Sequence, residues 1–452
     1  MQRSHNCRYG RGASVMRVSW RWWFIFAIVV GLAAGCSSGS SKARELAPST
    51  STTPSGKGKV PAPDAKPAGR PTGALANAPA KTAPGTAKKA PAAANTTGKP
   101  VPGQYIVTLK PGGNPRSVAA IAKVEPKYIY ENAVLGFAAK LNAGQLNALR
   151  HNKAVQDVTQ DGFVTASTWV TQAIDRTSAQ PWGLDRIDQQ RDLTYTYWSN
   201  AGVGVTAYII DSGIATADTD FGGRATDVYD AFGQNGQDCN GHGTHVAGTV
   251  GGTRFGVAKR VNLRGVRVLD CAGSGSWASI IAGIDWVRGH AVKPAVANIS
   301  IGCTNAAPCI NTTVDAATTN LVNSGVFVSV AAGNFNVDAC NGSPARAAGT
   351  ITVAAMDYTD TKASYSNWGQ CVDLYAPGTD ISSDWLANGA RNDSGTSMAS
   401  PHVTGVAALL KADYGDQTSA TIATWIKNAA RPNLIKSNPT GTPNKLLYMY
   451  GW

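Results

Sequence analysis

Hydrophobic and polar residues alternate in short runs along residues 103–165. Tyr105-Ile106-Val107-Thr108-Leu109 follows the two-residue period of a β-strand. Asn142 suits a helix N-cap, and Leu146 and Leu149 then share one helical face. The expected strands cover residues 105–109, 128–130, 136–141 and 155–158, and the expected helices cover 118–124 and the residues after Asn142. This order predicts a small two-layer α+β domain.

A different pattern begins near Trp182 and continues to the C-terminus. Unbroken apolar runs, which suit strands buried on both faces, alternate with helical periodicity. The expected strands are 205–210, 266–269, 296–300, 326–330 and 351–354. Such alternation predicts an α/β domain over residues 166–452, with a parallel β-sheet flanked by helices on both faces.

The first 102 residues lack the patterns of a folded domain. Residues 1–36 combine five arginines, an apolar run from Trp22 to Gly35, and Cys36. The run is short for a permanent membrane span and indicates an export signal. Residues 37–102 are almost entirely Ala, Pro, Lys, Thr, Ser and Gly without aromatic residues, which predicts a disordered linker.

Net charge is confined to this N-terminal region. The chain has 452 residues, 41 basic and 28 acidic, for a net charge of +13. Residues 1–102 hold 15 basic and 2 acidic residues, which leaves 26 of each sign in the remainder. The predicted folded part is therefore electrically neutral, and we expect no nucleic-acid partner.

Candidate catalytic residues stand at the ends of predicted elements. Asp211 follows the strand 205–210, at the carboxyl edge where parallel sheets carry their functional groups. His242 and Ser397 each begin a predicted helix among small residues. A serine hydroxyl needs a base to become a nucleophile, an imidazole can take its proton, and a carboxylate can orient the imidazole. The order Asp, His, Ser is one of the known orders of an acyl-transfer triad.

Acyl transfer also needs donors for the developing oxyanion. Ala331-Ala332-Gly333-Asn334 follows a predicted buried strand, and the Asn334 amide could supply one hydrogen bond. The backbone N–H of Ser397, at its helix start, could supply another. The other histidines near these segments, His245, His290 and His402, have no acidic or cysteine partners at zinc-site spacing, and we expect them to be packed or hydrogen-bonded.

Residues 182–187, 343–345, 375–378 and 441–444 resemble segments of the proteinase K and aqualysin branch of the subtilisin-like serine proteases. Three motifs together resemble the catalytic motifs of the same proteases. They are Asp211-Ser212-Gly213, Gly241-His242-Gly243-Thr244-His245 and Gly395-Thr396-Ser397-Met398-Ala399. Residues 103–165 resemble the inhibitory propeptide of these enzymes, a ferredoxin-like domain. The resemblance implies a serine endopeptidase that processes itself from an inhibited precursor and acts on polypeptides with broad specificity and an apolar first pocket. It makes Asp211, His242 and Ser397 the triad and Asn334 the oxyanion donor.

The resemblance also implies a set of substrate-binding residues. Two cleft walls would pair with an extended peptide, small residues would open the first pocket, and Trp277 would stand at the rim of the fourth, with plain surface packing as the alternative for Trp277. The implied residues are Gly273, Ser274, Gly275, Trp277, Ser300, Ile301, Gly302, Ala332 and Gly333.

Six of the eight cysteines follow residue 102, an even number that suits an oxidising compartment. Six cysteines allow fifteen connectivities, among which the sequence cannot choose. The resemblance implies Cys239 with Cys271 and Cys340 with Cys371, which leaves Cys303 with Cys309.

The resemblance implies no cofactor for catalysis, but it does imply structural Ca²⁺. The matching oxygens are the Pro344 and Arg346 carbonyls and the Asp373 carboxylate, with an ordinary surface acid as the alternative for Asp373.

Residues 32–36 resemble a bacterial lipobox, which implies acylation of Cys36; the alternative is an ordinary secretory signal cleaved near Ala34. We expect a monomer, whose precursor contacts the membrane only through this anchor on the outer side of the cytoplasmic membrane. The mature enzyme is then extracellular or periplasmic. A surface-tethered binding protein on an inactive protease scaffold is the competing function.

Overall fold

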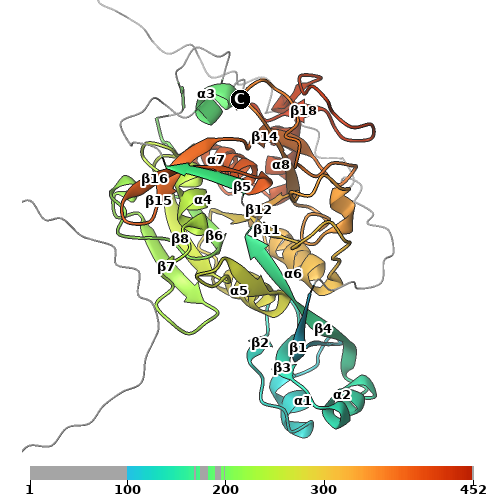
Figure 1. Cartoon of the computed structure of the whole chain (residues 1–452). Helices are drawn as coiled ribbons and strands as arrows, with labels where there is room; N and C mark the ends of the chain where they lie inside the picture. The colour runs from blue at the N-terminus through green and yellow to red at the C-terminus, as the bar shows by residue number, and fades with distance from the viewer. Residues whose placement is uncertain (1–98, 167–168, 174–181, 189–194, 198, 450–452) are drawn as a thin grey trace, which may run out of the picture. The chain divides into compact units, whose positions relative to one another are not determined.

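The computed structural model describes residues 99–166, 169–173, 182–188, 195–197 and 199–449 (Figure 1). The predicted export segment, Cys36 and nearly all of the predicted linker lie outside these residues. Among the described helices, none is long and apolar enough to cross a membrane.

The C-terminal part is built on a nine-stranded sheet among the described residues. Its strands, in order across the sheet, are β17 (Arg431–Pro432), β18 (Lys445–Leu446), β14 (Leu374–Pro377), β13 (Ile351–Met356), β12 (Phe327–Ala331), β10 (Ala295–Ile299), β6 (Thr206–Asp211), β8 (Asn262–Arg267) and β7 (Ala225–Asp230). All neighbours from β18 to β7 are parallel. The predicted parallel sheet is therefore confirmed.

Helices cover both faces of this sheet (Figure 1). Along β6, Ala207 and Ile209 pack into the core under α4 (His242–Gly251), α7 (Thr396–Tyr414) and α8 (Ser419–Ala429). Tyr208 and Ile210 pack into the second core, under α5 (Trp277–His290) and α6 (Thr312–Asn323). Both alternate faces are buried, which explains the unbroken apolar runs.

The shorter elements are α3 (Trp182–Asp188) and the 3₁₀ helices η1 (Thr219–Phe221) and η2 (Ala339–Asn341). One predicted strand was misplaced, because β8 covers Asn262–Arg267 in place of 266–269. Its partly exposed Asn262 and Arg264 alternate with buried residues, so this strand lacks the continuous apolar run that the prediction relied on.

The N-terminal domain has the predicted strand and helix order. Its elements are β1 (Pro100–Leu109), α1 (Pro115–Ile121), β2 (Tyr128–Tyr130), β3 (Gly136–Lys140), α2 (Ala143–Arg150) and β4 (Val155–Ala166). Asn142 caps α2 in a capping box with Gln145. Helix α1 begins three residues earlier than predicted, because Pro115 is well suited to the first turn and Asn114 caps it. Strand β1 begins within the segment predicted as linker.

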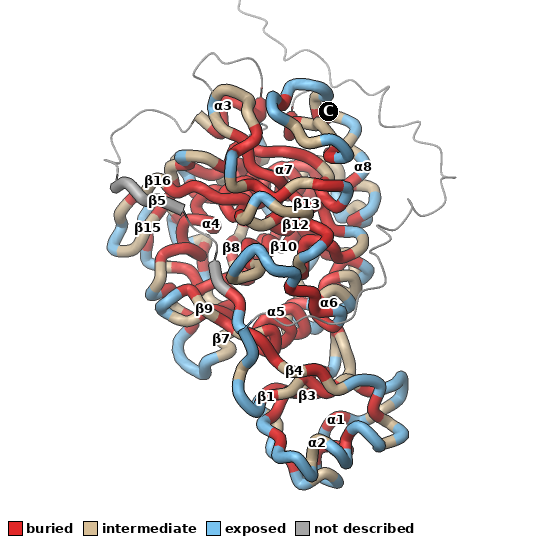
Figure 2. The backbone as a smooth tube through the Cα atoms, turned by 45° about the vertical axis from the view of Figure 1, so that its right-hand side comes forward, coloured by how far each residue is buried: buried red, intermediate tan, exposed pale blue. Residues whose placement is uncertain are grey.

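The antiparallel sheet of this domain is buried on both faces. Val107 and Leu109 pack with α1 and α2 in a core of their own, whereas Ile106 and Tyr130 belong to the same core as α5 and α6. Figure 2 shows exposed residues on α1 and α2 and several buried residues along β4. One face of this sheet is therefore covered by helices that lie far away in the sequence.

Three short strand groups border the carboxyl edge of the main sheet. β9 (Ser274–Ser276) and β11 (Ile301–Gly302) both pair with β4. β15 (Ile381–Trp385) and β16 (Gly389–Ser394) form a hairpin, to which β5 (Trp169–Ala173) adds a third antiparallel strand.

Candidate active site

Asp211 and His242 meet at the carboxyl end of the central strand β6. The strand ends at Asp211, and helix α4 begins at His242. Nδ1 of His242 donates a hydrogen bond of 2.7 Å to Oδ1 of Asp211, and both side chains are fully buried. This bond holds the imidazole in the tautomer whose Nε2 can accept a proton.

A buried hydrogen-bond network fixes the start of α4 against β6. Ser212 Oγ donates to Asp238 and accepts the backbone N–H of Gly243, each over 2.9 Å. The Asp238 carboxylate also accepts the backbone N–H groups of Gly241 and Thr244. A carboxylate at a helix N-terminus is stabilised by the unpaired amides there. A Cβ on Gly243 would come within 2.2 Å of the Gly213 carbonyl oxygen, so the close approach requires glycine at 243.

Ser397 is the second residue of α7 and contacts the loop after β10. Its hydroxyl donates to the Ser300 carbonyl over 3.1 Å, and the Ser300 hydroxyl donates to the Ser397 carbonyl over 2.9 Å. Nε2 of His242 has no hydrogen-bond partner in the described part of the chain. The structure thus joins Asp211 to His242, but in this precursor the Ser397 hydroxyl is bonded to Ser300 and not to His242. Catalytic hydrogen bonds often form only when substrate is bound for reaction.

The Asn334 side chain is held by the first residue of the same helix. Its Oδ1 accepts the backbone N–H and the hydroxyl of Thr396, each over 2.8 Å. These bonds use the carbonyl oxygen of the side chain, and the amide nitrogen is its donor group. Asn334 is almost fully buried, next to the start of α7.

The pKa values of the imidazoles near the site are shifted in opposite directions. Burial alone would lower the pKa of His242, but the Asp211 carboxylate raises it above its ordinary value. Burial lowers the pKa of His245 to about 3 and that of His402 to about 4. His245 donates to the Ile381 carbonyl, and His402 to that of Met398, each over 2.9 Å. These two rings are neutral packing groups, as expected from the sequence.

His290 is also held by packing and a backbone hydrogen bond. Its ring stacks on Trp286 with 4.6 Å between ring centres, and its Nδ1 donates to the Trp286 carbonyl over 2.8 Å.

Comparison with known proteins identifies the family. The profile of the Subtilase family matches residues 202–452, more than half of the chain. The chain belongs to the subtilase family. The profile of the peptidase inhibitor I9 family matches residues 104–167, so the N-terminal domain of this subtilase is its inhibitor domain.

Three relatives of this subtilase are serine proteases by name. "Alkaline serine exoprotease A" of Vibrio alginolyticus is 44% identical over 73% of this chain. The matched region spans 61% of the length of that relative. "Extracellular serine proteinase" of Thermus sp. (strain Rt41A) is 43% identical, over 77% of this chain and 90% of the relative. A solved cold-adapted subtilisin-like serine proteinase superposes with a TM-score of 0.58 and 46% identity, over 61% of this chain and all of that one.

The expected cleft walls of the subtilase both pair with strand β4 of the inhibitor domain. On one side Val164 pairs with Gly275 and Thr165 with Ser274. On the other side Ile301 pairs with Ala166. The inhibitor domain therefore inserts its last strand between β9 and β11, the position that the sequence analysis gave to an extended peptide. Gly273 immediately precedes this pairing.

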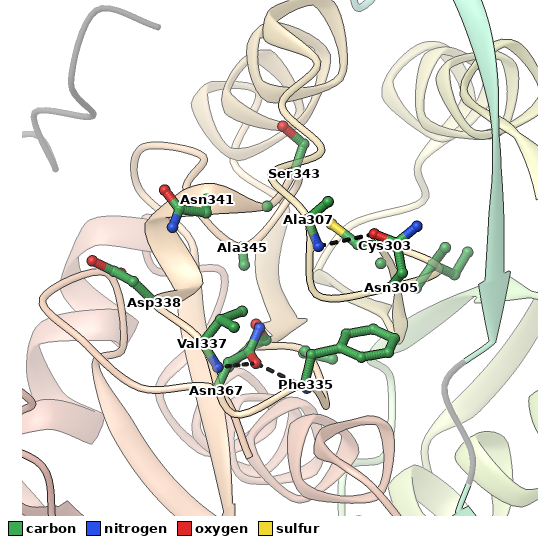
Figure 3. Close-up of a pocket in the computed structure, with 16 residues that line it drawn as sticks. Cys303, Asn305, Ala307, Phe335, Val337, Asp338, Asn341, Ser343, Ala345 and Asn367 are labelled. Atoms are coloured by element: carbon green, nitrogen blue, oxygen red, sulfur yellow. Dashed lines mark hydrogen bonds between the residues drawn. The ribbon is translucent and has the colours of Figure 1, made fainter. Parts of the chain in front are cut away.

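Beside this strand lies a pocket with an empty volume of about 360 Å³. Ala331, Ala332 and Gly333 line it next to Asn334, together with Ile301 and Gly302. Figure 3 shows residues of the 303–307 loop on one side and of the 337–341 segment on the other. Asp338 and Asn341 are polar members of a lining that is otherwise mostly small or apolar.

The Trp277 side chain lies in the interior of the precursor. Trp277 is the first residue of α5, is fully buried, and belongs to the same apolar cluster as Val164 of the inhibitor domain. This burial is that of the precursor, in which β4 occupies the cleft, so the rim position and plain packing both stay predictions for Trp277.

Ala166 and Trp169 both pair with segments close to Ser397. Ala166 pairs with Ile301, next to the Ser300 carbonyl that accepts the Ser397 hydroxyl. Three residues later, Trp169 pairs with Ser394, three residues before Ser397. One paired position thus lies next to Ser300, which contacts Ser397, and the other pairs with a residue three positions before Ser397.

Three disulfides agree with the pairing that the resemblance implied. They join Cys239 with Cys271, Cys340 with Cys371, and Cys303 with Cys309. The disulfide between Cys303 and Cys309 begins directly after β11. The Cys309 N–H donates to the carbonyl of Asn341, which lines the pocket, over 2.9 Å.

The oxygens expected to bind Ca²⁺ already have partners in the chain. Asp373 accepts the Thr352 backbone N–H over 2.8 Å and lies 3.9 Å from Lys427 Nζ. The Pro344 carbonyl accepts the Ala347 N–H over 2.8 Å. One carboxylate with backbone carbonyls is a hard-oxygen donor set, which suits Ca²⁺ in kind.

The side chain of Asp285 in α5 binds backbone groups of the inhibitor domain. Its nearly buried carboxylate accepts the N–H groups of Glu131, Asn132 and Ala133. In the reverse direction, Asp161 of β4 accepts the Ala278 N–H at the start of the same helix over 3.1 Å.

Sequence reasoning missed Asp238, Thr396, Asp285 and Asp161. Asp238 stands four residues before His242, and an acid at that distance from a helix start is a recognisable capping pattern. The other three act on partners far away in the sequence, so no local pattern identifies them.

Replacing Asp285 by alanine should weaken binding of the inhibitor domain. Three backbone donors would lose a charged acceptor, and we expect the inhibition constant of the separately added domain to rise about 100-fold. Asp285→Asn keeps one acceptor oxygen and should have a smaller effect. Asp413→Ala, which removes a carboxylate bonded to Asn200, is the control. An inhibition constant unchanged by Asp285→Ala would contradict this role.

Proposed function

We propose that this subtilase is an exported serine endopeptidase in which Asp211, His242 and Ser397 form the triad. The buried 2.7 Å bond between Asp211 and His242, beside the start of α7, is the observation that supports it. The Ser397 hydroxyl turns from Ser300 to Nε2 of His242, which takes its proton as the oxygen attacks the peptide carbonyl. His242 then protonates the leaving amine, and water releases the acyl group by the same steps.

The Asn334 amide and the Ser397 backbone N–H stabilise the oxyanion in this mechanism. Asn334 is suited to this role because Thr396 fixes its carbonyl end, so its amide needs little reorganisation during the reaction. No cofactor is required for these steps. The attraction between Asp211 and the protonated imidazole lowers the energy of the state in which charge has separated.

Substrates bind as a strand between β9 and β11, in the manner of β4. Main-chain hydrogen bonds are offered by every polypeptide, which favours broad specificity. The residues in contact are Gly273, Ser274, Gly275, Ser300, Ile301 and Gly302, with Ala332 and Gly333 at the first pocket. The small apolar lining of that pocket favours apolar side chains before the cleaved bond.

The inhibitor domain blocks the cleft until the precursor cuts itself. Because Ala166 and Trp169 both pair with segments close to Ser397, we place the cut between these residues.

A serine-directed fluorophosphonate tests the triad and the cut together. The wild-type chain should label covalently and yield a catalytic fragment that begins at residue 167, 168 or 169. Ser397→Ala should neither label nor cut, because the nucleophile is missing. Ser394→Ala, three residues earlier, is the matched control and should still label. Absence of labelling in a folded wild-type chain would favour the binding-protein alternative.

The chain carries, in order, the proposed anchor, the linker, the inhibitor domain and the enzyme. This order bears on where the enzyme is located after cleavage. We propose that residues 1–36 export the chain, that Cys36 is acylated, and that residues 37–102 form a spacer. Self-cleavage then leaves the lipid on the inhibitor fragment and releases a monomeric enzyme. The relative from Thermus, named as extracellular, supports export.

Cell fractionation tests this release. Before cleavage the chain should sediment with membranes, and a Cys36→Ser chain should not. After cleavage the catalytic fragment should be soluble, because it no longer carries the lipid. A catalytic fragment that stays in membranes without the inhibitor domain would contradict the proposal.

We also propose a structural Ca²⁺ at the Pro344 and Arg346 carbonyls and Asp373. A chelator should lower the midpoint of thermal unfolding of the mature enzyme by roughly 5 to 10 °C, since the bound ion stabilises only the folded state. Asp373→Asn should remove this dependence, and Asp270→Asn, another single-charge change, should not. A midpoint that is independent of Ca²⁺ would contradict the site.

A further inference from the structure

Asp393 is a buried acid close to the active site that the mechanism does not use. It lies in β16, four residues before Ser397. Its strand pairs with β5 through Arg391 and Asn392, and the register shifts between Asn392 and Ser394, which places Asp393 at a bulge. Bulges redirect side chains and occur often beside active sites.

The Asp393 carboxylate lacks the partners that normally accompany a buried acid. The residue is fully buried, and neither carboxylate oxygen makes a hydrogen bond of acceptable geometry in the described part of the chain. Burial raises the pKa of Asp393 to about 6, while the charges of His242 and Arg391 and the nearby Ser394 N–H oppose this rise. A buried carboxylate without hydrogen bonds is costly unless a nearby positive charge compensates it.

Two positive groups can provide this compensation. One is the Arg391 guanidinium, which lies 4.1 Å from the ring centre of Trp385 and is held over that ring. The other is His242 in its protonated form, whose Nε2 has no partner in the described part of the chain. The second charge exists only transiently at alkaline pH, when His242 carries the Ser397 proton.

Three carboxylates and one neutral imidazole, on different elements, interact electrostatically with His242. Asp211 lies on β6, Asp238 in the loop before α4, Asp393 on β16, and His245 on its own helix. Asp211 raises the pKa of His242 most, and Asp393 and Asp238 raise it further. Arg391 lies beside Asp393 and faces His245, whose pKa it lowers.

We propose that Asp393 is a positioning residue whose negative charge, acting through His242, stabilises the imidazolium formed during acyl transfer. The proposal rests on the serine protease function proposed above. In the resting enzyme the negative charge of Asp393 lowers the activity, because it favours a protonated His242 that cannot accept the Ser397 proton. Asp393 therefore increases the maximal rate and confines it to higher pH.

Asp393→Asn, made in the full chain and allowed to mature, tests this role. The substitution removes the charge and keeps the shape. The apparent pKa of the acid limb of kcat/KM should fall by about half a unit or more, because the imidazolium loses a stabilising charge. The plateau value of kcat at alkaline pH should fall about threefold or more, for the same reason.

Arg391→Gln provides the opposite change and keeps the test informative if Asp393→Asn fails to fold. Without the guanidinium, the Asp393 charge is less compensated, so the acid limb should move to higher pH. Asp413→Asn, the same charge change in α7, should leave the limb in place.

Three outcomes of these experiments can be told apart. An acid limb that stays within 0.2 pH units of wild type in both variants, in enzymes with unchanged thermal midpoints, overturns the role of Asp393; that margin is about the reproducibility of a pH profile. If wild type does not react with the fluorophosphonate, the proposed function itself fails. A kcat loss without a shift of the limb would mean that Asp393 acts by packing alone, and would also overturn the proposal.

Discussion

The hydrogen bond between Asp211 and His242 depends on how closely the first turn of α4 approaches the end of β6. Ser212 and Asp238 hold that approach from both sides, and the missing side chain at Gly243 permits it. The other functional groups of the site lie around this contact between α4 and β6. Helix α7 brings Ser397 to the same edge, and Thr396 at its start fixes Asn334.

The inhibitor domain shares its core with the enzyme that it blocks. Tyr130 and Ile106 are buried in the cluster of α5 and α6, so the domain lacks a complete core of its own on this face of its sheet. Two carboxylates cross the contact in opposite directions, Asp285 toward the inhibitor backbone and Asp161 toward the start of α5. Burial raises the pKa of Asp161, and hydrogen bonds from Gln104 and Ala278 oppose this rise. The last strand of the domain occupies the place between β9 and β11 that we propose for substrates.

Charge around the catalytic histidine is distributed unevenly. His245 and His402 are buried without carboxylate partners and stay neutral, whereas His242 is surrounded by three carboxylates. The same residue type therefore serves as a packing group or as a base according to the acids that the fold places next to it.

The sequence by itself determined the fold class, the order of elements in both domains, and the residues Asp211, His242, Ser397 and Asn334 as candidates. These follow from local patterns: apolar periodicity sets strands and helices, and small residues around a polar one mark a close approach of backbone. The start of α1 was misjudged although Pro115 signals it locally.

Only the tertiary structure decided which acids face His242, where the Ser397 hydroxyl points before activation, and how Asp285 holds the inhibitor. Asp393 and Ser300 act across contacts between segments that are distant in the chain. The burial of both residues, the hydrogen bonds of Ser300 and the absence of hydrogen bonds to the Asp393 carboxylate in the described part of the chain depend on how β16, β10 and α7 pack, which no local pattern records.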